Sequence, residues 1–351
     1  MKLKKISLFN IRNHQELELL FTNNNLILGN NAVGKTTVAE IIYYCCFFKS
    51  FRTNNIYDLI QFDKKEAQIK LIYEDKNQEN EIIVNFFNNK KKLFYNQQEV
   101  TNLYDILYKF NALIISPSNI DLINAAPAIR RNYLNMFIAQ INQEFLKNLI
   151  KYKKLIKIKN KILKDYKQTG QIDKIYLNIL NEELESLNLK IISKQNQVIN
   201  NLNDKINDII QDVTKKSESI KIKNLIIREN KTKEQIIQEE LKYGQTLKGN
   251  HLNDLEFTLN NKLCKAYASQ GQKRLISLSF FIAQSQIMYY EKGVKPLIIF
   301  DDVYLDLDLN RQIKLMNYIE KENQTIYITT NLEKMESLIQ KQEKYNIINI
   351  V

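Results

Sequence analysis

Apolar and polar residues alternate along much of the first third of the chain, which is the pattern of strands with one buried face. One segment differs, because Thr36 to Phe47 carries apolar residues at helical spacing. The first third is therefore predicted to be a sheet with one helix. Its predicted strands are Lys5–Phe9, Glu16–Phe21, Asn25–Leu28, Ala67–Tyr73, Glu81–Phe87, Lys92–Tyr95 and Ala112–Ile115.

The pattern changes to helical spacing after Pro127. From there to about Thr214 the chain has no proline and a single glycine, Gly170. Apolar stripes on both sides of that glycine predict two long helices that form an antiparallel hairpin. The first stripe is Ile141, Phe145, Leu149, Tyr152, Ile156 and Leu163; the second is Leu177, Leu180, Leu184, Leu187, Ile191, Val198, Leu202, Ile206, Ile209 and Val213, with a polar step at Lys194–Gln195.

Strand and helix patterns alternate again from about Ile220. The apolar runs Pro296–Phe300, Thr325–Thr329 and Asn346–Val351 are predicted strands, separated by helical stretches. The fold class is therefore α/β, with one mixed domain interrupted by an α-helical lobe. We divide the chain into a first half of that domain (1–125), the helical lobe with its hairpin (126–217) and a second half (218–351).

Composition places the chain among globular proteins, since 44% of the 351 residues are hydrophobic and 26% are charged. An odd number of cysteines, two of them adjacent (Cys45, Cys46 and Cys264), argues against a disulfide scaffold and favours a reducing cytoplasm. No apolar run approaches the roughly 20 residues of a membrane span. The net charge of +12 suggests a polyanionic partner such as nucleic acid, although charge of this size also serves solubility.

Much of the positive charge lies on the first arm of the predicted hairpin. Residues 141–170 contain nine lysines but only two acidic residues, Glu144 and Asp165. Spacings of three and four residues place five of the lysines along one side of a helix. Two interpretations stay open for this strip, a DNA-contacting surface and an ordinary solvated face. The five residues are Lys151, Lys154, Lys157, Lys161 and Lys164.

The segment after the strand Asn25–Leu28 matches the phosphate-binding pattern G-x-x-x-x-G-K-[ST]. It lies between a predicted strand and a predicted helix, where backbone N–H groups converge on phosphates. Lys35 is predicted to reach the β- and γ-phosphates, and the Thr36 hydroxyl to hold Mg²⁺. The segment therefore predicts a site for ATP and Mg²⁺. It reads Gly29, Asn30, Asn31, Ala32, Val33, Gly34, Lys35 and Thr36.

An apolar strand that ends in two acids supplies the second half of such a site. Asp301 and Asp302 follow the run Leu297–Phe300. Two adjacent carboxylates at the end of a buried strand are poorly explained by packing alone, because each must be compensated. We predict that Asp301 faces the magnesium ion and that Asp302 orients or deprotonates the attacking water. With Lys35, they form the predicted catalytic set.

A third segment precedes the acidic strand at the start of an apolar helix that runs through Ser277–Tyr290. Serine and glycine at a helix N-terminus suit anion binding, although an ordinary helix cap explains them as well. Most of the chain separates the phosphate loop from the acidic strand, which is unlike simple phosphate-loop kinases and GTPases. This segment, called the signature segment below, is Ser269, Gln270, Gly271 and Gln272.

Together these motifs resemble the ABC-type ATPase heads of the SMC superfamily, and within it most closely the RecF family. The resemblance covers essentially the whole chain. Its most specific marks are the signature segment and the acidic strand with Asp301–Val303. The other matching segments are Leu8–His14, Lys49–Thr53, Ser116–Pro117 and Pro127–Leu134.

The resemblance implies a homodimer that forms with bound ATP and has two composite sites. Ser269 to Gln272 would contact the γ-phosphate held by the other subunit, and Asp308 would face the dimer seam. Asn10 to Arg12 and Arg52 would line the nucleotide or the surface that faces DNA. The family further implies a weak, DNA-stimulated ATPase that acts at single-stranded, gapped or junction DNA. Its implied partners are RecO and RecR, with which it assists RecA loading in DNA replication, repair of DNA damage and the SOS response.

The sequence also departs from the family pattern. Ser118 and Asn119 stand where the family has an acidic pair. Leu252 and Asn253 stand where it has a basic residue followed by an acidic one. Leu305 replaces a serine of the loop that faces the dimer seam. Two alternatives therefore stay open. An ABC transporter ATPase subunit usually has a shorter helical subdomain and an acidic strand that ends in Asp-Glu. A non-hydrolysing DNA-binding scaffold of the same fold is consistent with Leu305, but the intact phosphate and acidic motifs argue against it.

Overall fold

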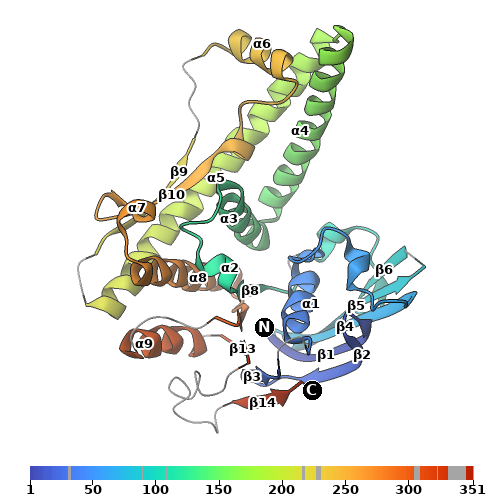
Figure 1. Cartoon of the computed structure of the whole chain (residues 1–351), viewed down its shortest axis with the longest axis vertical. Helices are drawn as coiled ribbons and strands as arrows, with labels where there is room; N and C mark the ends of the chain where they lie inside the picture. The colour runs from blue at the N-terminus through green and yellow to red at the C-terminus, as the bar shows by residue number, and fades with distance from the viewer. Residues whose placement is uncertain are drawn as a thin grey trace. The chain divides into compact units, whose positions relative to one another are not determined.

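The computed structural model in Figure 1 divides the chain into two compact units. The head unit consists of Met1–Asp121, Ile209–Lys216 and Gln270–Val351, and the helical unit consists of Leu122–Asp208 and Ser217–Ser269. The structure describes residues 1–30, 33–88, 90–107, 109–215, 218–226, 231–303, 309–321, 323–330 and 345–350.

An antiparallel sheet of six strands forms one layer of the head unit, in the order β2-β1-β4-β5-β6-β7. Side chains on one face of this sheet are buried and those on the other face are partly solvated, which explains the alternating sequence pattern. The strands are β1 (Lys2–Ile11), β2 (His14–Leu20), β4 (Glu66–Asp75), β5 (Gln78–Phe87), β6 (Lys90–Tyr95) and β7 (Gln98–Glu99).

A second sheet of five strands is entirely parallel and has the order β14-β3-β13-β12-β8. The strands β13, β12 and β8 are buried along their whole length, although β8 lies at the edge of the sheet. Continuous apolar runs are typical of buried parallel sheets. β13 separates the strand before the phosphate loop, β3, from the acidic strand, β12. The strands are β3 (Asn24–Leu28), β8 (Ala112–Ile115), β12 (Leu297–Asp301), β13 (Thr325–Thr329) and β14 (Asn346–Asn349).

Helix α1 (Lys35–Phe47) contributes to a core shared by both sheets. Its apolar residues are buried around nearly the whole circumference, which is the property of a helix enclosed on all sides. Helix α8 (Gln270–Lys292) contacts β8, α2 (Pro117–Ile120) and α9 (Leu309–Glu320). Short 3₁₀ turns complete the described part of this unit at η1 (Ile56–Leu59) and η2 (Leu103–Asp105).

The helical unit contains the predicted hairpin. Helix α4 (Gln143–Thr169) ends at Gly170, whose left-handed φ of 69° closes the last turn. Helix α5 (Lys174–Thr214) follows and runs beside α4 over its first half (Figure 1). The predicted apolar stripe of α5 is buried from Leu177 to Val213. The antiparallel hairpin is thus confirmed.

The polar step in that stripe is a buried hydrogen-bonded hub. Gln195 donates to the side chain of Asn135 at 2.7 Å. Its oxygen accepts hydrogen bonds from Asn224 and Asn250, at 2.9 and 2.8 Å. Gln195 therefore joins α5 to α3 (Pro127–Ile141), β9 (Ile220–Leu225) and η3 (Asn250–Leu252), and its buried amide is compensated.

A small antiparallel sheet, in the order β11-β10-β9, belongs to the helical unit. The sequence boundaries place these strands in the second half of the head, but the contacts group them with the hairpin. Asn203 and Asn207 of α5 bond the backbone of β9, which explains this grouping. The remaining elements of the unit are α6 (Lys233–Tyr243), β10 (Asp254–Leu259), β11 (Lys262–Leu263) and α7 (Cys264–Tyr267).

Among the described residues, no helix is both long enough and apolar enough to cross a bilayer.

Candidate nucleotide site

The two predicted motifs lie at the same edge of the parallel sheet. β3 and β12 point the same way on either side of β13, so the segments that follow them emerge together. The Thr36 hydroxyl, at the start of α1, hydrogen-bonds the Asp301 carboxylate at the end of β12. The structure thus brings Thr36 and Asp301 into contact although most of the chain separates them.

The two glycines of the phosphate loop occupy places that larger residues do not fit. A Cβ atom at Gly29 would lie 2.5 Å from the backbone oxygen of Ile350. A Cβ atom at Gly34 would lie 2.3 Å from Nε2 of His14, and the φ of Gly34 is 98°, which favours glycine. Asn31 and Ala32 lie outside the described residues.

Lys35 is buried at the first position of α1 and is held by its own loop. Its Nζ donates to the backbone oxygens of Gly29 and Asn30, at 2.8 and 2.7 Å. Among the described residues it forms no ion pair. The N-cap of α1, Gly34, offers no side-chain hydrogen bond to the amides of the first turn. A buried cation and free helical amides together provide a place for an anion such as phosphate.

The two acids at the end of β12 are incompletely compensated. Burial and the neighbouring charge of Asp302 raise the pKa of Asp301 to about 6, although Arg52, Lys35 and the Thr36 hydroxyl oppose the shift. The Oδ1 atoms of Asp301 and Asp302 are buried and have no hydrogen-bond partner among the described residues. Asp302 has a φ of 50°, which is uncommon for a residue other than glycine. Such strain and unpaired polar atoms gather at functional sites.

These oxygens fit a magnesium ion. Mg²⁺ is usually coordinated by one or two protein oxygens, and water and phosphate oxygens fill its remaining coordination positions. Thr36 and Asp301 supply one hydroxyl and one carboxylate that already touch. The unpartnered Oδ1 of Asp301 is the atom that such an ion would satisfy.

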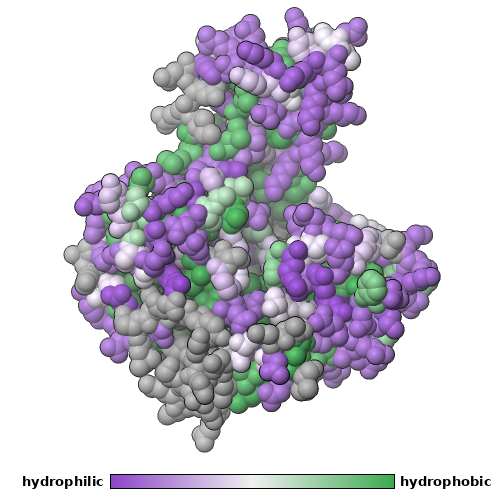
Figure 2. Space-filling model, viewed as in Figure 1, coloured by the Kyte–Doolittle hydropathy of each residue, from purple (hydrophilic) through white to green (hydrophobic). Residues whose placement is uncertain are grey.

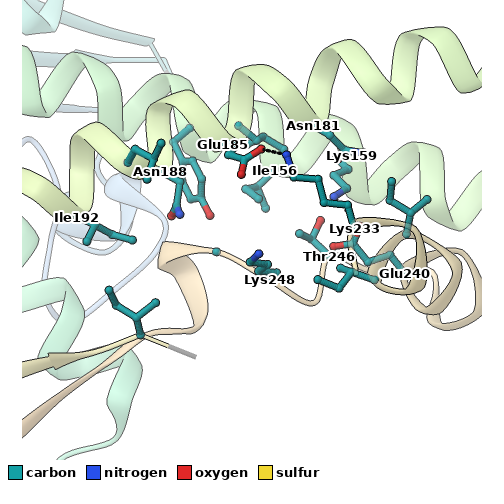
Figure 3. A pocket seen from close by; sticks show the side chains of 17 residues that line it. Ile156, Lys159, Asn181, Glu185, Asn188, Ile192, Lys233, Glu240, Thr246 and Lys248 are labelled. Carbon is teal, nitrogen blue, oxygen red and sulfur yellow. Dashed lines mark hydrogen bonds and ion pairs between the residues drawn. The ribbon is translucent and has the colours of Figure 1, made fainter. Parts of the chain in front are cut away.

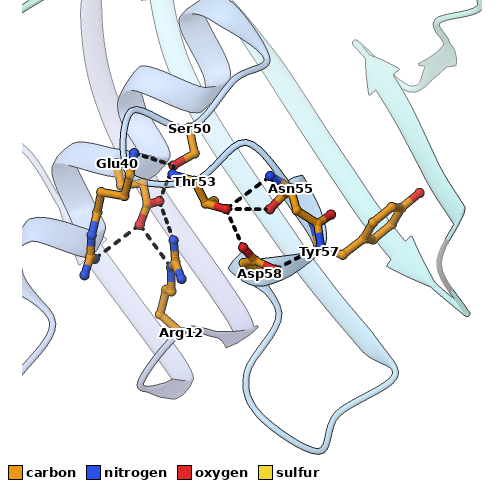
Figure 4. Close-up of polar contacts among 8 residues, drawn as sticks. Arg12, Glu40, Ser50, Thr53, Asn55, Tyr57 and Asp58 are labelled. Atoms are coloured by element: carbon orange, nitrogen blue, oxygen red, sulfur yellow. Dashed lines mark hydrogen bonds and ion pairs between the residues drawn. The ribbon is translucent and has the colours of Figure 1, made fainter.

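A buried carboxylate on α1 organises the basic residues beside the loop (Figure 4). Glu40 is fully buried and forms a two-point ion pair with Arg12, at 2.6 and 3.1 Å. Arg52 approaches the same carboxylate at 3.4 Å, and the Ser50 hydroxyl also donates to it. Two guanidinium groups that share one carboxylate leave positive charge near the phosphate loop.

The family resemblance predicts that Asn10 to Arg12 and Arg52 lie beside the nucleotide or DNA. The structure shows Arg12 and Arg52 on Glu40, and the charge of Arg52 acts on Asp301. Asn10 instead donates to the backbone oxygen of Glu66 at 3.1 Å. Their contact with nucleotide or DNA stays a prediction.

The sequence predicts no role for Glu40, Ser50 or His14, although Ser50 and His14 lie in segments that match the family pattern. The available signal for Glu40 was a charged residue inside the apolar helix Thr36–Phe47, since a buried charge requires a partner. His14 approaches the backbone oxygen of Gly34 at 3.4 Å, a contact between distant segments that no local pattern reveals.

The signature segment begins α8. Ser269 and Gln270 are exposed, and a Cβ atom at Gly271 would meet no atom within 4 Å. In the described part of the chain, no hydrogen bond joins Gln270 or Gly271 to the phosphate loop. Asp308 and Leu305 lie outside the described residues, and so do the side chains of Ser118 and Asn119.

A family model described as the RecF/RecN/SMC N-terminal domain matches residues 2–347. A protein of Lactobacillus johnsonii, named DNA replication and repair protein RecF, is 32% identical to the chain and covers 98% of it and 96% of its own length. The chain belongs to the RecF family. A RecF of Limosilactobacillus reuteri is 30% identical over 95% of the chain and 93% of its own length. This membership favours the DNA-repair interpretation over the transporter subunit.

Solved structures agree with this assignment. The chain is similar to the recombination mediator protein RecF bound to ATPrS, with a TM-score of 0.85, 27% identity, and coverage of 95% of the chain and 93% of that structure. A RecF–ATP structure gives a TM-score of 0.82 at 28% identity, with 94% and 92% covered. An Smc head from Pyrococcus furiosus, 19% identical with a TM-score of 0.53, shares the fold. The predicted ABC-type ATPase head is thus confirmed.

Proposed function

We propose that the chain is an ATP-dependent DNA-binding protein of recombinational gap repair and replication-fork maintenance. The observation that carries the proposal is the edge of the parallel sheet where Lys35, Thr36 and Asp301 meet with unused donors and acceptors. Two structures similar to this chain are of RecF with ATP or with ATPrS. ATP is therefore the anion that we assign to this edge.

The proposed chemistry follows from the places of the side chains. Lys35 exchanges its two backbone carbonyl partners for the β- and γ-phosphates, and the amides at the start of α1 bind the same phosphates. Thr36 and Asp301 would hold Mg²⁺, which neutralises charge on the phosphates. Asp302 orients the attacking water and accepts its proton. Hydrolysis is slow in this proposal and serves as a switch.

A homodimer completes the site. Glycine in the first turn of α8 costs about 1 kcal/mol relative to alanine, and the space beside Gly271 is open within the chain. The exposed Ser269 and Gln270 stand at the same helix terminus. ATP bound to a second copy approaches this terminus closely and occupies the open space beside Gly271. Ser269 to Gln272 of one copy then contact the γ-phosphate held by the other.

DNA is the proposed polyanionic partner. Lys151, Lys154, Lys157, Lys161 and Lys164 are all exposed on α4. Lys151 is paired with Glu183, so it contributes less free charge than the other four.

The proposed protein partners are RecO and RecR. A similar structure is of the recombination mediator RecF in the RecFOR pathway, and we extend these two partners to this chain. The three cysteines are buried and form no disulfide, which suits the reducing cytoplasm that we propose as the compartment.

The test measures ATP turnover and molar mass by light scattering, with and without gapped DNA. The wild type should form a dimer with ATP and hydrolyse it faster when gapped DNA is added. Ser269→Arg should bind ATP as a monomer without dimerising, and Asp302→Asn should accumulate as an ATP-bound dimer. A wild type that stays monomeric with ATP contradicts the composite site. Dimerisation without any turnover favours the non-hydrolysing scaffold.

A further inference from the structure

The helical unit contains a pocket (Figure 3). It has a volume of about 320 Å³ and is enclosed by α4, α5, α6 and the loop that follows α6. In Figure 3 the side chains of Glu185, Asn188 and Ile192 extend from α5 toward the loop that carries Lys248. This size lies within the range of pockets that bind ligands.

The wall of the pocket is mainly aliphatic, and part of it faces solvent. Leu189 is 64% exposed and Ile226 is 40% exposed, although both line the pocket. Ile156, Ile192 and Ile237 are partly buried around them. Aliphatic side chains that converge on a concave surface without covering one another mark an interaction site.

The charged pair at the base of the pocket is already satisfied. Lys159 and Glu240 are both buried and lie 2.6 Å apart. Glu240 also accepts a hydrogen bond from the backbone amide of Leu247 at 2.9 Å. This pair therefore shapes the base of the pocket but offers little free charge to a ligand, since its partners are within the chain.

One buried donor at the pocket is unused. The Nδ2 atom of Asn181 is buried and has no hydrogen-bond partner within the described ranges. An unpaired amide group of this kind costs about 1–3 kcal/mol. A peptide carbonyl is a natural acceptor for it, because an amide side chain offers the same hydrogen bond as a neighbouring backbone.

The charged side chains that line the pocket are three lysines and two glutamates, which leaves an excess of one positive charge. Lys248 is exposed and forms no ion pair with any described residue. Lys233 is exposed too, and its ion pair with Glu185 at 2.8 Å is accessible to exchange. The neighbouring helix α4 carries lysines in large excess over acids. Charge complementarity therefore selects an acidic partner, whereas the aliphatic wall offers no place for a phosphate backbone.

We propose that this pocket docks an acidic peptide segment of a partner protein. The segment inserts a bulky aliphatic side chain between Leu189 and Ile226, and one of its backbone carbonyls accepts the Asn181 amide proton. Its acidic residues face Lys248 and Lys233. The pocket shares no lining residue with the phosphate loop, so we expect the peptide to bind with and without ATP.

The experiment uses fluorescence anisotropy with the full-length chain and a labelled synthetic peptide in which Leu and Ile alternate with Asp and Glu. The wild type should bind it saturably, and Leu189→Glu should weaken binding by at least about tenfold. The matched control is Ile179→Glu, which alters another exposed residue of α5 that is outside the pocket. This control and Lys35→Ala should bind as the wild type does. Thermal melting confirms that the variants are folded.

Two altered peptides separate the contributions of the aliphatic and the acidic residues to peptide binding. Alanine in place of Leu and Ile should abolish binding, and lysine in place of the acids should weaken it strongly. Absence of saturable binding by the wild type overturns the proposal. So does equal affinity of Leu189→Glu and Ile179→Glu, and so does displacement of the peptide by single-stranded DNA from wild type and Leu189→Glu alike.

Discussion

Two lysines, one in each unit, are equally buried but differently paired. Lys35 and Lys159 each have 5% of their surface exposed. Lys159 pairs with the buried carboxylate of Glu240, whereas the bonds of Lys35 to described residues go to two backbone carbonyls. The charge of Lys159 is compensated by the chain itself, which is typical of a structural role. The charge of Lys35 is left for a ligand, which is typical of a binding site.

Other charged side chains of the two units differ in their pairing in the same way. In the helical unit Arg130 forms a two-point ion pair with Asp254, at 2.9 and 2.7 Å. In the head unit Asp301 and Asp302 each keep a buried oxygen without a partner among the described residues. The acids at the functional edge of the head are therefore incompletely paired, whereas these buried charges of the helical unit are fully paired and stabilise it.

Removal of a compensated charge should give the largest effect on stability. Lys159→Ala leaves Glu240 buried and unpaired, so the free energy of unfolding should fall by about 3–5 kcal/mol. Lys35 forms no ion pair with a described acid, although its charge acts on Asp301, so Lys35→Ala should change the free energy of unfolding by less than about 1 kcal/mol. Urea unfolding followed by circular dichroism measures both variants. Equal losses of unfolding free energy in the two variants would show that Lys35 and Lys159 do not differ in how the chain compensates them.

Glu40 tests whether the basic residues beside the loop depend on one carboxylate. Glu40→Gln keeps the shape of the side chain but leaves Arg12 and Arg52 without a counter-charge, so we expect a loss of about 1–3 kcal/mol. Arg52 is the smaller contributor, because its contact is longer and its side chain is 45% exposed. Urea unfolding of Glu40→Gln and Arg52→Gln measures the two contributions. The expectation fails if Arg52→Gln is the more destabilising change.

The pH dependence of stability should reveal the uncompensated acid. The pKa of Asp301 is about 6 in the folded chain and near its ordinary value of 3.8 when unfolded. The folded state therefore binds more protons between these values, and the contribution of Asp301 to stability is lost as pH rises from about 4 to 6. Asp301→Asn should gain stability relative to the wild type across this window, by up to about 3 kcal/mol at neutral pH.

The measurement is urea unfolding of metal-free protein at several pH values. Mg²⁺ with ATP should reduce the advantage of Asp301→Asn, because bound cation stabilises the carboxylate. A constant difference between the two proteins from pH 4 to pH 7.5 would show that Asp301 titrates normally.

The lysine strip of α4 should affect DNA binding but not folding. Changing Lys151, Lys154, Lys157, Lys161 and Lys164 to Gln should weaken binding with little dependence on DNA sequence. It should also lower the salt slope by about 0.9 for each lost duplex phosphate contact. ATP hydrolysis without DNA should be unchanged. A variant whose DNA affinity and salt slope equal those of the wild type would identify the strip as a solvated face.

The elements of the site could be predicted from sequence where they depend on local pattern. The strands Asn25–Leu28, Ala112–Ile115 and Thr325–Thr329 were found because continuous apolar runs mark a buried parallel sheet. The loop with Lys35 was found because glycine spacing is constrained by phosphate geometry.

What escaped prediction depends on contacts between distant segments. No local rule places β13 between β3 and β12, brings Arg12 and Arg52 to Glu40, or sets His14 against Gly34. The same reason explains why β9 and β10 were assigned to the head by sequence but pack with the hairpin. Burial of Lys159 also requires knowledge of Glu240, which lies on another helix.

An equilibrium titration with ATP and Mg²⁺ tests the central claim most directly. Lys35 is a buried cation that forms no ion pair with any described residue, so Lys35→Ala should lose at least about a hundredfold in ATP affinity while it keeps its stability. Exposed Lys49, in the loop after α1, supplies the control, and Lys49→Ala should bind ATP as the wild type does. ATP affinity of Lys35→Ala equal to that of the wild type would contradict the account.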